Sequence, residues 1–199
     1  MDLYRIDVCR SMTGCRRAVS EVKNIIKIIE EAFQETDFND KRKRVIGEKF
    51  KQHHLFKVGV SGCANCCSQP QIKDFAVVAK RMPVYNKELC NLCGACVKAC
   101  REKGLTIVKD KLFFQKSLCL GCGDCWSVCL KGALKPGEEN WRLLIGGKLG
   151  RHPQLAREIG EIKDVEVKKY LTEAINHILN SSSVKRPADI LSLLDFSEK

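Results

Sequence analysis

Twelve of the thirteen cysteines in this 199-residue chain fall into three groups of four, and each group has a spacing suited to an iron–sulfur cluster. Two groups are contiguous and share the form Cys-x2-Cys-x2-Cys-x3-Cys, one from Cys90 to Cys100 and one from Cys119 to Cys129. Such a loop presents three thiolates to one [4Fe–4S] cubane, and in two-cluster proteins the fourth comes from the other motif. The spacing therefore predicts two clusters that carry electrons. Their ligands are Cys90, Cys93, Cys96 and Cys129 (the Cys90 group), and Cys119, Cys122, Cys125 and Cys100 (the Cys119 group).

Other uses of closely spaced cysteines fit this repeat less well. Zinc binds paired Cys-x2-Cys motifs, but eight cysteines that repeat with a period of 29 residues favour two cubanes. A disulfide scaffold requires an oxidising compartment, and the first residues show no basic-then-apolar signal peptide. No apolar run approaches the roughly 20 residues of a transmembrane helix. We therefore expect a cytoplasmic protein without membrane insertion.

The third group is divided along the chain into Cys9-x5-Cys15 and Cys63-x3-Cys67 (the split group). The second pair belongs to residues 60–67, which read Val-Ser-Gly-Cys-Ala-Asn-Cys-Cys. This combination resembles the sirohaem-binding signature of the sulfite and nitrite reductase family, in which a Cys-x5-Cys precedes a Ser-Gly-Cys-x-Asn-x-Cys. The resemblance implies that the split group holds a third [4Fe–4S] cluster. It also implies further cofactor contacts: Cys67 bridges to the iron of sirohaem, beside Ser61, Gly62 and Asn65.

The order of the remaining motifs extends the resemblance over roughly residues 5–155. Dissimilatory and anaerobic sulfite reductases insert a two-cluster ferredoxin after the corresponding strand, and then resume with a segment similar to residues 144–153. The implied fold is α+β, in a short form that lacks the family's N-terminal half-domain. A sulfite/nitrite-reductase-like sirohaem and [4Fe–4S] domain is built from residues 1–83 and 136–199, and a bacterial-type two-cluster ferredoxin module is inserted at residues 84–135.

Lysines and arginines near the split group are candidates for binding an anionic substrate or the carboxylates of a cofactor. Family members carry a lysine four residues before the serine of Ser-Gly-Cys, which here is Lys57. Arg16 and Arg17 directly follow Cys15 and are further candidates. Each of the three fits a solvent-facing charge equally well.

Several positions near the split group leave alternatives open. Leu55 and Ala64 stand where the family has a second lysine and a proline, which weakens the anion site but not the cluster ligands. Cys66 fits a bystander thiol better than a redox-active sulfur or a substitute ligand. His53 and His54 fit surface residues better than proton donors.

Hydrophobic periodicity and turn signals predict the elements that position these residues. Apolar residues at helical spacing predict an amphipathic helix over residues 18–33, and the polar stretch at 34–51 is expected to be partly helical. Pro83 is expected to end a buried strand, and Pro136-Gly137 to close the ferredoxin segment. The predicted strands are residues 55–60, 75–79, 105–108, 112–114 and 141–147, and the predicted C-terminal helices are residues 165–180 and 188–196, joined by a linker at 181–183.

The formal net charge of +11 raises the question of a nucleic-acid partner, but no nucleic-acid motif accompanies it. Three oxidised cubanes with four thiolates each would remove about six of these charges. We therefore expect no nucleic-acid binding. The basic runs at residues 41–44 and 168–169 are expected to be solvated faces, with a docking surface for an acidic electron donor as the alternative.

The leading hypothesis is a small sirohaem and iron–sulfur oxidoreductase that reduces sulfite, nitrite or a related oxyanion. Electrons from a low-potential donor protein would enter at one ferredoxin cluster, cross to the second, pass to the split group and reach sirohaem through Cys67. A partner subunit or a second copy of the chain would complete the sirohaem pocket. The alternative is a sirohaem-free iron–sulfur subunit that relays electrons within a larger redox complex.

Overall fold

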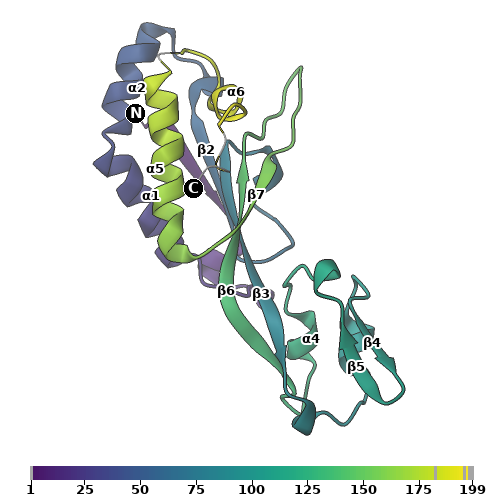
Figure 1. Cartoon of the computed structure of the whole chain (residues 1–199). Helices are drawn as coiled ribbons and strands as arrows, with labels where there is room; N and C mark the ends of the chain where they lie inside the picture. Colours follow the sequence, from purple (N-terminus) through teal and green to yellow (C-terminus); the bar gives the residue numbers. More distant parts are fainter. Residues whose placement is uncertain (1, 182, 195, 197–199) are drawn as a thin grey trace.

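The computed structural model describes residues 2–181, 183–194 and 196, and its fold is α+β (Figure 1). A five-stranded sheet has the order β1-β2-β3-β6-β7. The first three strands are parallel, whereas β6 and β7 are each antiparallel to the strand before them in this order. The strands are β1 (Tyr4–Val8), β2 (Phe56–Ser61), β3 (Phe75–Tyr85), β6 (Leu134–Ile145) and β7 (Arg157–Ile162).

Three helices cover one face of this sheet: α1 (Lys23–Glu35), α2 (Phe38–Ile46) and α5 (Asp164–Asn180). An amphipathic helix buries the stripe of apolar residues that recurs every three or four positions, and α1 buries Ile25, Ile29 and Phe33 in this way. The Phe33 ring stacks on Tyr4 of β1 with ring centroids 3.9 Å apart. Each fully buried side chain of this size contributes about 1.5–3 kcal/mol, so the helical layer fixes this face of the sheet.

Strands β3 and β6 extend beyond the rest of the sheet as a two-stranded ribbon, and residues 86–133 lie at its far end (Figure 1). We call residues 86–133 the small lobe. Leu105 and Cys125 of the small lobe pack together with Leu134 of β6 in one apolar cluster. The elements of the small lobe are α3 (Ala95–Ala99), β4 (Leu105–Val108), β5 (Lys111–Phe114) and α4 (Asp124–Ser127), and β4 and β5 form a separate two-stranded sheet.

Most predicted elements are confirmed, with shifted ends. The helix expected over residues 18–33 begins at Lys23, because the amide of Val19 donates to the carbonyl of Gly62 at 2.8 Å instead of joining the helix. The last predicted helix is the shorter α6 (Pro187–Leu191). Positions 182 and 195 of the predicted linker and helix lie outside the described residues. The predictions contained neither β1 nor β7.

The expectation that Pro83 ends its strand was wrong. Strand β3 pairs with β2 from Phe75 to Val78, so Pro83 lies beyond that ladder, on an edge where a missing amide hydrogen is tolerated. Pro83 pairs with Pro136 of β6 next to a shift in register. Pro136 therefore lies inside a strand and does not close the segment before it. The ribbon of β3 and β6 crosses both predicted boundaries of the inserted module, at residues 84 and 135.

The basic runs are not simple solvated faces. Arg42 on α2 is wholly buried, and its guanidinium donates to the carbonyl oxygens of Ser183 at 2.6 Å and Lys185 at 3.0 Å. In the second run, Lys168 of α5 forms an ion pair of 2.7 Å with Glu35 of α1. Arg42 thus anchors the segment before α6. Across the described ranges, no helix is both long and apolar enough to span a bilayer.

Candidate iron–sulfur and anion-binding site

The four cysteines of the split group meet where two parallel strands end. Cys9 follows β1 and Cys63 lies just beyond β2, and these neighbouring strands end at the same edge of the sheet. The amide of Gly62 donates to the sulfur of Cys9 at 3.3 Å. Burial raises the pKa of the Cys63 thiol, and charge on Cys9, Cys15 and Cys67 raises that pKa further. The structure thus places all four cysteines of the split group in one region, at the end of β2.

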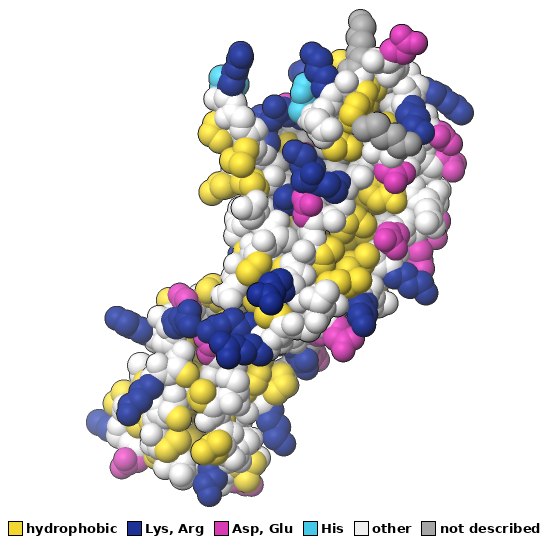
Figure 2. Space-filling view, turned by 180° about the vertical axis from the view of Figure 1, so that it is seen from behind, with side chains coloured by type: hydrophobic (Ala, Val, Ile, Leu, Met, Phe, Trp, Pro, Cys, Tyr) yellow, Lys and Arg dark blue, Asp and Glu magenta, His cyan; other side chains and the backbone are white. Residues whose placement is uncertain are grey.

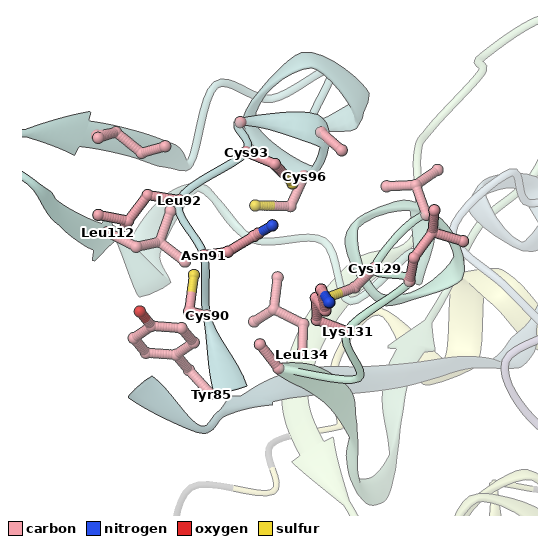
Figure 3. Close-up of a pocket in the computed structure, with 16 residues that line it drawn as sticks. Tyr85, Cys90, Asn91, Leu92, Cys93, Cys96, Leu112, Cys129, Lys131 and Leu134 are labelled. Atoms are coloured by element: carbon pink, nitrogen blue, oxygen red, sulfur yellow. The ribbon is translucent and has the colours of Figure 1, made fainter. Parts of the chain in front are cut away.

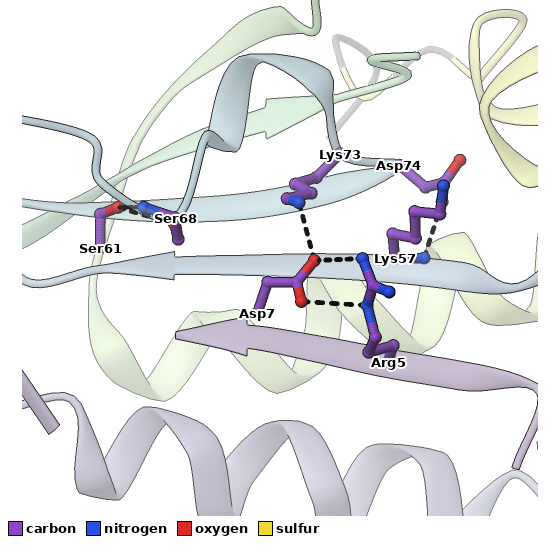
Figure 4. A network of polar contacts seen from close by, with 7 residues as sticks. All are labelled: Arg5, Asp7, Lys57, Ser61, Ser68, Lys73 and Asp74. Atoms are coloured by element: carbon purple, nitrogen blue, oxygen red, sulfur yellow. Dashed lines mark hydrogen bonds and ion pairs between the residues drawn. The ribbon is translucent and has the colours of Figure 1, made fainter. Parts of the chain in front are cut away.

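The turn after β2 is tightly built. A Cβ at Gly62 would lie 2.6 Å from the Cβ of Ser11, closer than real Cβ atoms approach, so glycine is required there. The hydroxyls of Ser61 and Ser68 form a buried hydrogen bond of 2.7 Å across the turn (Figure 4). Cys67 lies within this turn and is the exposed thiol of the group. Cys67 is therefore the sulfur most open to a further ligand.

Cys66 has a different environment from its neighbour. Its backbone adopts a left-handed conformation with φ of 54°, and it packs against the apolar cluster of Ala76, Val78 and Leu144. Burial raises the pKa of the Cys66 thiol, partly offset by a hydrogen bond with Gln71. This packing agrees with the interpretation of Cys66 as a bystander thiol.

In the small lobe, each predicted group of four cysteines lines one cavity. The Cys90 group lines a cavity of about 180 Å³ together with Tyr85, Leu112 and Leu134 (Figure 3). A hydrogen bond with Cys90 raises the pKa of Tyr85 to about 12. The Cys119 group lines a second cavity of about 30 Å³. Each cavity thus combines three cysteines of one motif with the fourth of the other.

The donor sets fit cubanes better than single metal ions. Within the described residues, no three His, Cys, Asp or Glu side chains are close enough to hold one ion. Each thiolate of a cubane binds a different iron atom, so the four sulfurs stand farther apart than the ligands of one ion. Soft thiolates around an apolar cavity are the surroundings that iron–sulfur clusters select. The two groups of the small lobe, each around its own cavity, therefore fit iron–sulfur clusters.

A pocket of about 560 Å³ lies on the face of the sheet opposite the helices. Successive side chains of a strand point to opposite faces. Because Tyr4 and Phe56 pack in the helix-covered core, Arg5 and Lys57 point to the other face. The predicted residue Lys57 therefore lies in a cationic pocket, whose basic side chains are Arg5, Lys57, Lys73, Lys148 and Arg186.

Two acids bind to residues of this cationic pocket, and one of them, Asp74, also lines it (Figure 4). Asp7 accepts hydrogen bonds from Lys73 at 2.7 Å and from Arg5 at 3.0 Å. Asp74 accepts a hydrogen bond of 2.7 Å from the backbone amide of Lys57, and burial raises the pKa of Asp74 to about 7. Sequence reasoning missed Arg5, Lys73 and both acids, because a pair such as Asp7 and Lys73 is 66 residues apart and shows no local pattern.

His53 and Lys148 line the same pocket, whereas His54 does not. His54 is buried and its Nδ1 accepts a hydrogen bond of 3.1 Å from the amide of Lys51, so its interpretation as a surface residue was wrong. His53 lines the pocket. Lys148 forms an ion pair with Asp189 of α6. This ion pair links a side chain of the pocket to the short C-terminal helix.

Arg16 and Arg17 do not line the pocket that contains Lys57. Arg16 is exposed. Arg17 points to the small lobe, where its guanidinium lies 3.4 Å from the carboxylate of Asp124.

The comparison with protein families agrees with this geometry. The profile of the family described as "Nitrite and sulphite reductase 4Fe-4S domain" matches residues 5–181, which include the split group, the small lobe and α5. The chain belongs to this family. A curated relative, the coenzyme F420-dependent sulfite reductase of Methanocaldococcus jannaschii, is 38% identical over 111 residues. The match covers 54% of this chain but 18% of the relative, so the chain corresponds to a small part of that protein.

Two solved structures were compared with the chain. The crystal structure of dissimilatory sulfite reductase I (DsrI) has a TM-score of 0.62 and 16% identity, and the match covers 97% of this chain and 50% of that chain. The NirA protein of Mycobacterium tuberculosis has a TM-score of 0.49 and 13% identity, over 92% of this chain and 24% of that chain. The likeness to DsrI shows that the α+β arrangement of this chain is a fold found in sulfite reductases.

Family membership and the donor sets lead to the same cofactor class. The matched family is described by its 4Fe–4S domain. The chain supplies three sets of four cysteine thiols, which are the ligands that such clusters need. The protein is therefore an iron–sulfur protein of an oxidoreductase family.

Proposed function

We propose that the chain is a small sirohaem and iron–sulfur oxidoreductase that reduces sulfite, nitrite or a related oxyanion. Electrons would be delivered through its own small lobe. The observation that carries this proposal is the split group, in which four thiols from two distant segments meet at one edge of the sheet with Cys67 exposed. The relative from M. jannaschii is named a sulfite reductase, which supports the substrate class.

We assign one [4Fe–4S] cluster to each of the three cysteine groups. The clusters of the Cys90 and Cys119 groups would form an inserted two-cluster ferredoxin module within residues 84–135, and their two cavities support this assignment. Such clusters supply one-electron carriers whose potentials depend on charge, hydrogen bonds and exposure. The contribution of the chain is to hold the sulfurs at a fixed spacing and to set those surroundings.

We assign Cys67 as the axial ligand of sirohaem, because it is the exposed thiol of the split group. Sirohaem, when bound, would supply the iron that binds the oxyanion. Ser61, Gly62 and Asn65 belong to the turn that presents Cys67. Lys57 and its cationic neighbours would bind the cofactor's carboxylates or the oxyanion, since charge-assisted hydrogen bonds to anions are strong in a partly desolvated pocket.

We propose that a low-potential electron-donor protein docks on the small lobe around Leu130. Leu130 is 101% exposed, and Val128, Lys131 and Cys93 are also exposed around the cavity of the Cys90 group. Figure 2 shows apolar side chains on the small lobe with Lys and Arg side chains between them. An apolar centre with a cationic rim fits a small acidic carrier protein.

A partner subunit or a second copy of the chain would complete the cationic pocket on its open side. The likeness to DsrI, of which this chain covers 50%, is compatible with such an assembly. We place the protein in the cytoplasm, where thiols remain reduced and available to iron.

One observation favours the alternative of a sirohaem-free electron-transfer subunit. Three cations of the pocket already have acidic partners, since Arg5 and Lys73 share Asp7, and Lys148 pairs with Asp189. Fewer charges are then left for the carboxylates of sirohaem. In that case the split group would keep its cluster and relay electrons within a larger complex.

Metal and cofactor analysis after anaerobic purification separates the two functions. Three cubanes and one sirohaem correspond to about thirteen irons per chain, and three cubanes alone to about twelve. Sirohaem bands with about thirteen irons support the reductase. About twelve irons without a tetrapyrrole, from a host that makes sirohaem, support the electron-transfer subunit. About eight irons would mean that the split group holds no cluster, and both proposals would fail.

A further inference from the structure

The carboxylate of Asp124 forms ion pairs with two arginines, each next to cysteines of a different group. Asp124 begins α4, one residue before Cys125 of the Cys119 group. Its carboxylate lies 3.4 Å from the guanidinium of Arg17 and 3.8 Å from that of Arg101. Arg17 follows Cys15 of the split group by two residues, and Arg101 directly follows Cys100. One acid thus lies between two arginines that belong to different parts of the fold.

A pocket of about 190 Å³ separates the same two groups. Its lining combines Cys63 and Asn65 of the split-group turn with Cys122 and Leu120 of the small lobe. Arg17, Arg101 and Asp124 also line this pocket. Figure 2 shows Lys and Arg side chains gathered where the small lobe meets the rest of the molecule. The Cys119 group therefore faces the split group across a narrow, charged space.

The backbone of the small lobe also packs directly on the sheet at this place. The amide of Arg81 on β3 donates to the carbonyl of Gly121 at 3.4 Å. A Cβ at Gly121 would lie 2.7 Å from that amide nitrogen, and a Cβ at Gly123 would lie 3.1 Å from the side chain of Val19. Glycine at both positions allows the loop that carries Cys119 and Cys122 to approach β3 and the segment after Cys15.

We propose that Asp124 is a positioning residue that holds the Cys119 group against the split group and so sets the passage of electrons between them. The inference rests on the proposed function, in which both groups hold clusters. One electron leaves the Cys119 side and one enters the split-group side, and no bond of Asp124 forms or breaks. Asp124 acts on the spacing of the two groups through Arg17, and Arg101 keeps its carboxylate oriented.

The ion pair is suited to local docking. The side chains of Arg17 and Asp124 are 38% and 26% exposed, and pairs of such exposure contribute little to global stability. Loss of the ion pair between Arg17 and Asp124 should shift the equilibrium of the loop toward its undocked state roughly two- to fivefold. High salt should produce a similar shift, because it screens partly exposed charges.

The test compares Asp124→Asn and Asp124→Glu in the anaerobic holoprotein. Glu102→Gln is the matched control, since Glu102 lines the same pocket and its neutralisation makes the same charge change. Iron and sulfide content are measured first. Hydrogen exchange over residues 119–125 and 15–20 then reports docking. The spin–spin interaction in the electron paramagnetic resonance spectrum of the reduced protein reports the spacing of the clusters.

We expect Asp124→Asn to keep its iron, to exchange roughly two- to fivefold faster in both segments, and to show a weakened spin–spin interaction. Asp124→Glu should restore part of both signals, and Glu102→Gln should match the parent. Arg17→Gln should give the same changes as Asp124→Asn. If Asp124→Asn does not fold, Arg17→Gln takes its place in the test.

Two results would overturn the inference: unchanged exchange and spin–spin interaction in Asp124→Asn, or equal changes in Glu102→Gln. Failure of the proposed function is distinguishable, because it appears as about eight irons in the parent protein, whereas hydrogen exchange still reports the contact made by Asp124.

Discussion

The ion pair between Asp7 and Lys73 allows a direct test of how the cationic pocket is held together. Asp7 has two cationic partners that differ in burial (Figure 4). The side chain of Lys73 is 8% exposed, and that of Arg5 is 53% exposed. Because both cations share one carboxylate, their contributions can be compared against the same acceptor.

We expect Asp7→Asn to destabilise the protein by about 3 kcal/mol, because it leaves the buried ammonium of Lys73 without a counter-charge. Arg5→Met should cost at most about 1 kcal/mol, as for other exposed pairs. The double variant Asp7→Asn/Lys73→Met should recover most of the loss, since replacing a buried pair by apolar groups is often neutral. In a chain of this length, about 3 kcal/mol lowers Tm by roughly 6–12 °C.

The assay is anaerobic thermal unfolding of the holoprotein, followed by circular dichroism at one scan rate with iron content matched between variants. Equal losses of Tm in Asp7→Asn and Arg5→Met would refute the reasoning, because the burial of Lys73 would then make no difference. A double variant as unstable as Asp7→Asn would also refute it, since Asp7 would then act through a contact other than Lys73.

Three further predictions concern the pocket and the small lobe. Burial raises the pKa of Asp74 from 3.8 to about 7, so its contribution to stability is fully present below about pH 4 and is lost as pH rises to about 7. Asp74→Asn should remove this decline in denaturant midpoints measured between about pH 5 and pH 8. If each cavity in the small lobe holds one cluster, Cys93→Ala/Cys129→Ala should lose no more iron than either single variant. Cys93→Ala/Cys100→Ala should lose about twice as much iron, measured by iron and sulfide analysis. Gly121→Ala should cost about 1–3 kcal/mol in chemical denaturation, because its φ is 64° and the new Cβ would lie 2.7 Å from a backbone nitrogen of β3.

These predictions have matched controls. Gly132 has the same φ of 64° as Gly121, but a Cβ at Gly132 would have its nearest heavy atom 3.9 Å away. Equal destabilisation of the two alanine variants would mean that contact with β3 does not matter. Equal iron loss in the two double-cysteine variants would contradict the crossed assignment. A pH-dependent decline that persists in Asp74→Asn would mean that another group causes it.

The cysteine groups could be predicted because the spacing of cluster ligands is a local property of the sequence. Three thiols from one short loop must converge, so Cys-x2-Cys-x2-Cys carries most of the information about a site. Strands β2 and β3, on either side of the turn that carries Cys63 and Cys67, also have clear patterns, with buried runs such as Phe75 to Ala79. The structure adds that β1 lies beside β2, which brings Cys9 to Cys63.

The elements that sequence reasoning missed have features that a local pattern does not contain. Strand β7 reads Arg-Glu-Ile-Gly-Glu-Ile and lies at the edge of the sheet, where one side faces solvent and polar residues are tolerated. Pro83 breaks the pattern of a central strand, yet it is accommodated on an unpaired edge. His54 is buried because its ring closes a turn on Lys51, a contact that its sequence neighbours do not reveal.

The positive charge of the chain has more than one use, and only the structure separates them. Arg42 is buried against backbone carbonyls, and Arg17 pairs with Asp124, a residue 107 positions away. These cations hold elements of the fold together. Three cubanes would offset about six of the eleven formal charges. Five basic side chains line one pocket of about 560 Å³ around Lys57, and three of them are paired with acids. We propose that this set of cations binds a compact polyanion, as a carboxylate-rich cofactor or an oxyanion would be, in preference to the extended phosphate backbone of a nucleic acid.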